Sequence, residues 1–376
     1  MGTRRIRTAC TAAAVAVVAF TGCESSPPES SGSTAGSSAS APAPAPSSGG
    51  APTSSSESRT TVASKLDVPW GLAFLPDRSA LLTLRDKAEV LQIREGAKPV
   101  SVGKIDGVEP NGEGGLLGIA VSPQFASDKR VFVYYTTGSD NRVERFTFDG
   151  KALHADRVIL QGIPNADHHN GGRLEFGPDG RLYIGTGDAG ETSHSQDTSS
   201  LGGKILRVDQ DGNAPTDNPN SGSPVWSWGH RNVQGLAWDS AGRMFASEFG
   251  QNTWDELNLI RKGANYGWPV VEGKGNRAPY VDPLVQWRTS DSSPSGLAIG
   301  TDGAAYMAAL AGRALWRVPL NGITAGTPER LLDNQLGRIR TVERASDGRL
   351  WIVTSNTFRG SPSDDDDRVI AMRPPL

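Results

Sequence analysis

The sequence predicts an all-β fold, a six-bladed β-propeller, and three observations support that prediction. A short strand–turn–strand unit recurs six times along the 376 residues of the chain. The copies are 45 to 62 residues apart, which is the length of one propeller blade. No stretch of the chain shows a long helical period in its apolar residues. The equivalent apolar position of the six copies is occupied by Leu72, Ile119, Leu174, Leu236, Leu297 and Val342.

The copy around Leu174 is the clearest of the six. Leu174 and Phe176 alternate with polar residues, and an apolar run returns at residues 182–184. Asp179 and Gly180 lie between these runs, and Asp-Gly in that position is the strongest short signal for a hairpin turn. Further strands of the blades are predicted at residues 90–93, 143–147, 205–208, 257–260 and 315–318.

Residues 60–376 are long enough for six four-stranded blades, and we interpret them as the folded domain. The first predicted strand, at residues 61–63, is expected to pair with residues 369–371 of the last blade. This pairing would close the ring and remove exposed sheet edges, which a large all-β protein must avoid.

The N-terminal residues 1–23 have the layout of an export signal. Arg4 and Arg5 precede an apolar run at residues 12–20 that is too short to span a bilayer. Small residues before Cys23 resemble a lipobox, in which the cysteine is acylated and becomes the mature first residue. We therefore expect a cell-surface lipoprotein anchored at the outer face of the cytoplasmic membrane, or a secreted protein if the signal is simply cleaved. Both the general and the twin-arginine export route stay open.

Residues 24–59 consist mainly of Ser, Pro, Gly and Ala and are predicted to form a disordered linker. Such a composition cannot bury enough apolar surface to fold on its own. The two cysteines of the chain, Cys10 and Cys23, both lie in the signal region. The domain therefore has no disulfide, and its stability must come from its core.

The charge balance argues against a nucleic-acid partner. The chain has 38 basic and 41 acidic side chains and a net charge of −3, so it lacks the basic field that nucleic-acid binding needs. We expect membrane contact only through the lipid anchor, and either a monomer or a dimer. The run of four aspartates at residues 364–367 is interpreted as a solvated loop rather than a metal site.

The loops that precede the first strand of each blade should converge on the central channel. Three arginines around one cavity repel each other unless an anion lies among them, and the guanidinium fork matches carboxylates. Histidine titrates near neutral pH and therefore suits proton transfer. As a group these residues predict a planar, polyanionic ligand beside a histidine, although each alone is equally compatible with a salt bridge or a structural role. The convergent residues are Glu113, His168, His169, Arg231, Asn232, Arg338 and Arg340, and of the two histidines we expect His168 to be structural or exposed.

The motifs that carry these residues resemble those of one enzyme family. They span residues 112–118, 169–174, 229–235, 255–258, 265–269 and 338–340. From about residue 60 to its end, the chain is similar to the soluble pyrroloquinoline-quinone (PQQ) dependent glucose/sorbosone dehydrogenases. The similarity is greatest to their aldose sugar dehydrogenase branch.

This resemblance implies an enzyme that oxidises the anomeric C1 hydroxyl of an aldose sugar to a lactone. His169 would be the general base that takes the hydroxyl proton while hydride passes to C5 of the quinone. The cofactor contacts that the resemblance implies are Glu113, Arg231, Asn232, Arg338 and Arg340. Glu113 stands where relatives often have a glutamine. The particular sugar and the electron acceptor are not predicted.

Calcium is the second cofactor that the resemblance implies. In the family this ion polarises the quinone and is held partly by backbone carbonyls, which here would belong to Gly250 and Gln251. Glu256 and Tyr266 match positions linked to a second, structural calcium. Glu256 would bind that ion through its side chain and Tyr266 through its backbone.

The sequence departs from the family pattern at two places. Many relatives carry a basic residue in the blade-five loop, where this chain has Ala311. Arg313 is two residues away and is a candidate replacement. Gln251 replaces a proline, which we expect to matter less because the family uses only the carbonyl at this position.

Two other functions are compatible with a propeller. The first is a non-catalytic cell-surface propeller that binds a glycan or a partner protein, and the absence of a basic residue at Ala311 favours it. The second is a calcium-dependent lactonase, which would need several side-chain carboxylates converging on the ion. His169 together with the arginine set favours the dehydrogenase.

Overall fold

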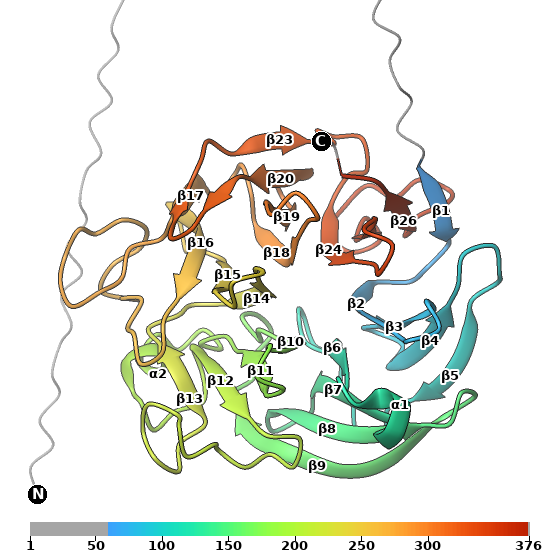
Figure 1. Ribbon diagram of the computed structural model, residues 1–376, viewed down its shortest axis with the longest axis horizontal. Coiled ribbons are helices and arrows are strands. Elements are labelled where there is room, and N and C mark those ends of the chain that lie inside the picture. The colour runs from blue at the N-terminus through green and yellow to red at the C-terminus, as the bar shows by residue number, and fades with distance from the viewer. Residues whose placement is uncertain (1–58, 375–376) are drawn as a thin grey trace, which may run out of the picture. The chain divides into compact units, whose positions relative to one another are not determined.

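The computed structural model describes residues 59–374, so the predicted export signal (1–23) and linker (24–59, apart from Arg59) lie outside it. Within this range, six four-stranded antiparallel sheets are arranged around a central axis as the blades of a propeller (Figure 1). The predicted fold is confirmed. No helix in residues 59–374 is both long and apolar enough to cross a membrane.

The first three blades follow one another along the chain. Blade one contains β2 (Pro69–Phe74), β3 (Ala80–Leu84), β4 (Glu89–Ile93) and β5 (Val100–Lys104). Blade two contains β6 (Leu116–Val121), β7 (Arg130–Thr136), β8 (Asn141–Phe148) and β9 (Leu153–Ile163). Blade three contains β10 (Arg173–Phe176), β11 (Leu182–Gly185), β12 (Lys204–Val208) and β13 (Val225–Trp228).

The last three blades complete the ring. Blade four contains β14 (Val233–Trp238), β15 (Met244–Glu248), β16 (Trp254–Ile260) and β17 (Val285–Arg288). Blade five contains β18 (Pro294–Ile299), β19 (Ala305–Ala309), β20 (Ala314–Val318) and β23 (Glu329–Leu331). Blade six contains β24 (Ile339–Arg344), β25 (Leu350–Thr354), β26 (Val369–Met372) and β1 (Thr60–Ala63).

The ring closes between the two ends of the domain, as the sequence predicts. Strand β1 pairs antiparallel with β26, with Thr60 opposite Ala371 and Ala63 opposite Val369. The six recurring apolar positions all lie in the innermost strands of their blades, which are β2, β6, β10, β14, β18 and β24.

A glycine in the recurring unit lets the innermost strands approach one another closely. A Cβ atom on Gly118 would lie 2.0 Å from the carbonyl oxygen of Gly172, and one on Gly235 would lie 2.4 Å from that of Ser295. Apolar side chains between neighbouring blades form the core, and Val133 is fully buried there. The innermost loops are therefore carried on a rigid support.

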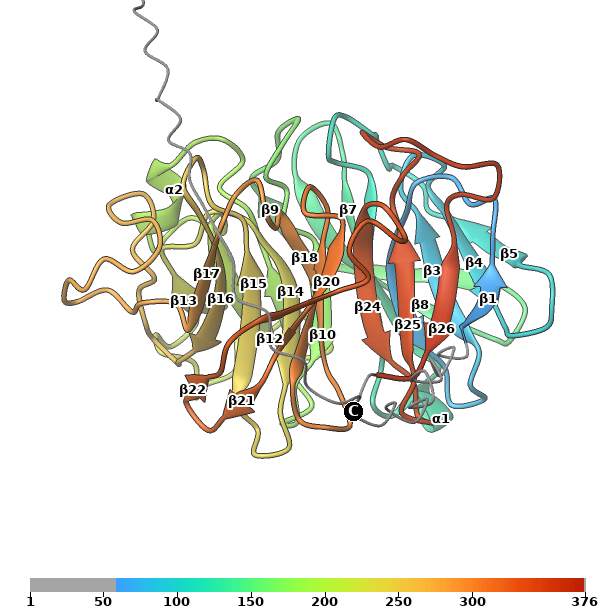
Figure 2. The same cartoon turned by 90° about the horizontal axis from the view of Figure 1, so that it is seen from above.

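Short elements extend the two faces of the propeller. The helices are α1 (Phe125–Asp128) and α2 (Ser193–Gln196), and a small hairpin consists of β21 (Leu320–Asn321) and β22 (Thr324–Ala325). In Figure 2, α2 and the long loop between β25 and β26 lie on one face, and α1 and the β21–β22 hairpin lie on the other.

Candidate active site

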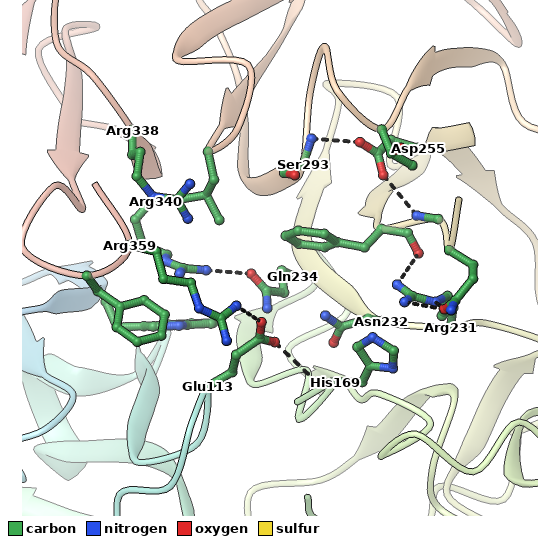
Figure 3. A pocket seen from close by; sticks show the side chains of 17 residues that line it. Glu113, His169, Arg231, Asn232, Gln234, Asp255, Ser293, Arg338, Arg340 and Arg359 are labelled. Carbon is green, nitrogen blue, oxygen red and sulfur yellow. Dashed lines mark hydrogen bonds and ion pairs between the residues drawn. The ribbon is translucent and has the colours of Figure 1, made fainter. Parts of the chain in front are cut away.

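A cavity of about 310 Å³ lies among the loops around the central axis. Six of the seven convergent residues predicted from the sequence line it, all but His168, and so do both residues predicted to offer carbonyl ligands (Figure 3). These eight are Glu113, His169, Arg231, Asn232, Gly250, Gln251, Arg338 and Arg340. Loops before the innermost strands, the start of β24 and the loop between β15 and β16 therefore bring these residues to one place.

His169 lies in a tight turn just before β10. Its φ is +54°, and the neighbouring Asn170 holds the turn by donating to the carbonyl oxygen of Ala166 at 2.7 Å. The buried Asn170 also accepts a hydrogen bond from Asn141 at 3.0 Å. This anchoring keeps the imidazole at the cavity although the backbone adopts an unusual conformation.

A buried carboxylate orients the His169 ring. Asp188 Oδ1 lies 2.7 Å from His169 Nδ1, and Trp268 Nε1 donates to Asp188 Oδ2 at 2.9 Å. Burial would raise the pKa of Asp188, but hydrogen bonds from His169, Gly190 and Trp268 hold it below its usual value. An ionised Asp188 accepts from a protonated Nδ1, which assigns the acceptor role to Nε2. The ring is thus set up as a base.

His168 has a different environment from His169. It contacts Asp167, its side chain is 45% exposed, and it is not among the residues that line the cavity. The two imidazoles meet edge to face with centroids 4.3 Å apart. Geometry therefore favours His169 as the site histidine.

Arg338 and Arg340 are cations without an acidic partner in the described part of the chain. Arg340 is buried and donates to Gln234 Oε1 at 2.7 Å, while Arg338 is half-buried. The Nε atoms of both arginines are buried and have no hydrogen-bond partner. Burial, together with the charges of Arg85 and Arg338, lowers the pKa of Arg340 to about 9. Both guanidiniums line the cavity without an ion pair in residues 59–374, so this side of the cavity suits an anion.

Arg231 is held by the side chain of Gln251. The Gln251 Oε1 atom accepts from Arg231 Nε at 2.9 Å and from Nη2 at 2.5 Å. Replacing the family's proline by glutamine therefore adds an acceptor for Arg231, which the sequence did not predict. Asn232 links this loop to the histidine turn, because its Oδ1 accepts from the Gly171 N–H at 2.9 Å.

Arg359 supplies a cation that was not predicted from the sequence. Its Nη1 donates to Glu113 Oε1 at 2.7 Å, while Glu113 Oε2 accepts from the His169 N–H at 3.3 Å. Arg359 lines the cavity from the loop between β25 and β26, whereas Ala311 and Arg313 are exposed and do not line it. The prediction of convergent residues considered only residues before the first strand of each blade, so it did not include the loop between β25 and β26.

The motif at residues 255–258 contributes to the cavity through Asp255. This carboxylate accepts from the Gly250 N–H at 2.9 Å and from the Ser293 N–H at 2.6 Å. Burial raises the pKa of Asp255 to about 7. Only the next residue of the motif was predicted from the sequence, and Asp255 was overlooked.

Glu256 and Tyr266 lie behind the cavity and do not line it. Glu256 accepts from the Gly273 N–H at 2.7 Å, and the Tyr266 hydroxyl donates to the Leu259 carbonyl at 2.7 Å. Burial and the neighbouring Glu248 raise the pKa of Glu256 to about 8. Residues 59–374 contain no cluster of three His, Cys, Asp or Glu residues suited to a metal. The second calcium therefore stays a prediction.

Comparison with known proteins connects this cavity to one family. The family model described as glucose/sorbosone dehydrogenase matches residues 66–360. The PQQ-bound aldose sugar dehydrogenase of Streptomyces coelicolor has a similar structure, with a TM-score of 0.82 and 50% identity, covering 84% of this chain and 98% of that one.

Two curated relatives agree with the family match. The aldose sugar dehydrogenase of Escherichia coli is 30% identical over 333 residues, which cover 78% of this chain and 88% of that protein. Quinoprotein glucose dehydrogenase B of Acinetobacter calcoaceticus is 30% identical over 260 residues, which cover 59% and 54%. Because the family match includes nearly the whole propeller with His169 and the arginines, the chain belongs to the glucose/sorbosone dehydrogenase family.

Proposed function

We propose that the protein oxidises the anomeric C1 hydroxyl of aldose sugars to lactones, with PQQ as the hydride acceptor and Ca²⁺ as a Lewis acid. One observation carries the proposal: an oriented imidazole and two unpaired arginines line the same cavity. The imidazole suits a base, and the two arginines suit a ligand with several carboxylates.

The residues of the cavity fit both cofactors. Arg338 and Arg340 line the cavity without an ion pair in residues 59–374 and so offer their guanidiniums to carboxylates, and Arg231 offers a third guanidinium on the opposite side (Figure 3). The backbone oxygens of Gly250 and Gln251 are ligands of the kind that Ca²⁺ prefers. When bound, PQQ supplies a two-electron acceptor for hydride, and Ca²⁺ polarises it.

His169 performs the proton transfer in this proposal. Its Nε2 atom accepts the proton of the sugar's C1 hydroxyl, while the C1–H bond breaks and its hydrogen departs with the electron pair, as hydride, to the acceptor. C1 thereby becomes the carbonyl carbon of the lactone. Asp188 keeps Nδ1 protonated and stabilises the imidazolium that forms, as its 2.7 Å hydrogen bond allows.

Similar proteins support this choice of reaction. The Streptomyces coelicolor relative, half identical in sequence, binds PQQ in its solved structure, and the Escherichia coli relative is an aldose sugar dehydrogenase. The glycan- or protein-binding propeller is less well supported, because such a function gives no reason for the His169–Asp188 pair. A lactonase is also less well supported, because it would need several side-chain carboxylates converging on the ion. Among the described lining residues the carboxylates are two, Glu113 and Asp255.

A spectroscopic titration tests the proposed function. Purified protein is titrated with PQQ in the presence of Ca²⁺, and an aldose is then added while the absorbance of the quinone is followed. We expect saturable binding followed by reduction of the quinone. Saturable binding without reduction by any aldose would contradict the proposed reaction, and absence of binding would favour the non-catalytic propeller.

We also propose that the protein is exported and held at the outer face of the cytoplasmic membrane through Cys23. The support is the lipobox-like sequence, which lies outside the described residues. Labelling with a radioactive fatty acid should mark the wild type and not Cys23→Ala. Release of both proteins into the medium without label would exclude the anchor and leave a secreted enzyme.

A further inference from the structure

One carboxylate oxygen beside the cavity accepts four consecutive backbone N–H groups. Glu272 Oε1 lies 2.7 Å from the nitrogen of Gln251, 3.0 Å from that of Asn252, 2.9 Å from that of Thr253 and 3.1 Å from that of Trp254. Glu272 lies in the segment between β16 and β17 and does not itself line the cavity. The four hydrogen bonds outweigh the effect of burial and keep the pKa of Glu272 below its usual value.

The direction of these N–H groups determines the direction of two carbonyls. In a trans peptide, the C=O of one residue points opposite to the N–H of the next. The peptide bonds of residues 250–254 are not among the cis bonds of the chain. Because the N–H groups of Gln251 and Asn252 point at Glu272, the carbonyls of Gly250 and Gln251 point away from it. Both of these residues line the cavity.

Neither carbonyl is used by the protein itself. Within residues 59–374, no hydrogen bond to the oxygen of Gly250 or of Gln251 is present. The Gly250 N–H is held separately by Asp255 Oδ1 at 2.9 Å. The turn is therefore fixed by two carboxylates while its two oxygens stay available for a ligand.

Close packing explains why the turn begins with glycine. A Cβ atom on Gly250 would lie 1.9 Å from the Trp254 carbonyl oxygen and 2.7 Å from Glu272 Oε1. Any other residue at this position would force the turn away from Glu272. Gly250 thus allows the backbone to close around the carboxylate.

We propose that Glu272 is a positioning residue that holds the Gly250 and Gln251 carbonyl oxygens ready to bind Ca²⁺. This inference rests on the proposed function, in which Ca²⁺ accompanies PQQ. Groups that orient metal ligands without touching the metal commonly change metal affinity ten- to a hundredfold when they are removed. The negative charge of Glu272 behind the two ligands also favours a cation.

Two variants of Glu272 and one matched control test the proposal. Glu272→Ala removes the acceptor, and Glu272→Gln keeps an amide oxygen but removes the charge. Asp209→Asn is the control, because Asp209 Oδ1 also accepts two backbone N–H groups, from Asp211 and Asn213, in an exposed turn away from the cavity. The measurement is the Ca²⁺ concentration that gives half-maximal PQQ binding, followed by quinone absorbance, beside the Tm of the cofactor-free protein.

We expect Glu272→Ala to raise the half-saturating Ca²⁺ concentration by about ten- to a hundredfold. Glu272→Gln should give a smaller increase, and Asp209→Asn should match the wild type. If Glu272→Ala does not fold, an increased Ca²⁺ requirement in Glu272→Gln still supports the proposal. A lowered Tm with an unchanged Ca²⁺ requirement would make Glu272 a purely structural residue and overturn it.

The wild type separates this inference from the proposed function. A wild type that binds no PQQ at any Ca²⁺ concentration contradicts the proposed function and the inference with it. A wild type that binds PQQ in a Ca²⁺-dependent way, with Glu272 variants that need no more Ca²⁺, contradicts only the role of Glu272.

Discussion

The two sides of the cavity differ in how their charges are satisfied. On one side lie Arg338 and Arg340, which we call the arginine wall; they form no ion pair within residues 59–374, and each leaves Nε unpartnered. On the other side Asp255 lines the cavity, and Asp188 and Glu272 lie behind its lining; we call these three carboxylates the carboxylate wall, and each accepts at least two hydrogen bonds. The protein completes the second wall by itself and leaves the first one incomplete.

This difference indicates separate tasks for the two walls. A buried, unpaired charge costs free energy that a bound anion of opposite charge offsets. The arginine wall therefore favours binding of an anionic ligand. The carboxylate wall holds an imidazole and two backbone oxygens in fixed directions, and such preorganisation supports catalysis and cation binding.

The largest effect is expected from the histidine that the carboxylate wall orients. His169→Ala should lower sugar oxidation by a factor of about 10² or more, because it removes the positioned base. PQQ binding should be retained, since the arginine wall is unchanged. Steady-state dye reduction and a quinone titration measure the two quantities. Near-normal turnover would assign the base to another group, with His168 as the next candidate.

Removing a charge from the arginine wall should weaken PQQ binding but raise the Tm of the cofactor-free protein. In Arg340→Met, loss of a charge-assisted hydrogen bond should weaken PQQ binding by about ten- to a hundredfold. The Tm of the cofactor-free variant should rise by roughly 2 °C or more, because a buried unpaired charge is removed. Gln234 keeps its hydrogen bond from Ser295 at 3.0 Å.

Arg349→Met is the matched control for this variant. Arg349 forms ion pairs with Glu95 and Asp347 outside the cavity, so its removal should not change PQQ binding and should not raise the Tm. A lower Tm in cofactor-free Arg340→Met than in the wild type would show that the unpaired charge does not destabilise the cofactor-free protein.

Cations at the mouth of the cavity should have smaller effects. The Arg359 side chain is 56% exposed, and an exposed charge pair contributes about 0.2–1 kcal/mol. Arg359→Ala should therefore weaken PQQ binding by only about two- to fivefold. Ala311→Lys should tighten it by a similar factor, and Arg313→Ala should leave it unchanged. A tenfold loss in Arg313→Ala would mean that Arg313 fills the place of the missing basic residue.

The smallest effect concerns the pH dependence of stability. Burial raises the pKa of Asp255 to about 7, above its usual value of 3.8. Its contribution to the stability of the cofactor-free protein is therefore complete below about pH 4 and is lost as the pH rises through 7. The Tm of the wild type should fall between about pH 5 and pH 8, and it should fall less in Asp255→Asn. An equal fall in both proteins, measured by calorimetry, would exclude Asp255 as the cause.

The repeat explains why much of this site could be predicted from the sequence. Glu113, His169 and Arg231 precede the innermost strands of their blades and Arg340 lies at the start of β24, so their places in the repeat alone could assign them to one cavity. In four of the six units, a glycine before the recurring apolar residue lets those strands lie close together; blade three has Arg173 and blade six has Thr341 at this position.

Two of the residues that the sequence did not predict follow the second strand of a blade, a place that the prediction of convergent residues did not consider. Asp188, which contacts His169, follows β11, so β10 and β11 lie between the two residues in the sequence. Arg359 follows β25, the second strand of blade six, and does not precede a first strand. The prediction of a solvated loop at residues 364–367 is wrong for Asp367, which is buried and accepts from Thr354 Oγ1 at 3.0 Å. A side chain that caps a distant backbone leaves no pattern in the nearby sequence, and Glu272 is a second example.

A crystal structure of the protein with PQQ and Ca²⁺ would test the division of the cavity into two walls most directly. We predict carboxylate oxygens of PQQ within hydrogen-bond distance of the guanidinium groups of Arg338 and Arg340, and a cation on the carbonyl oxygens of Gly250 and Gln251. His169 should keep its hydrogen bond to Asp188. A quinone bound outside this cavity, or bound inside it without contact to either guanidinium, would contradict the roles assigned to the two walls.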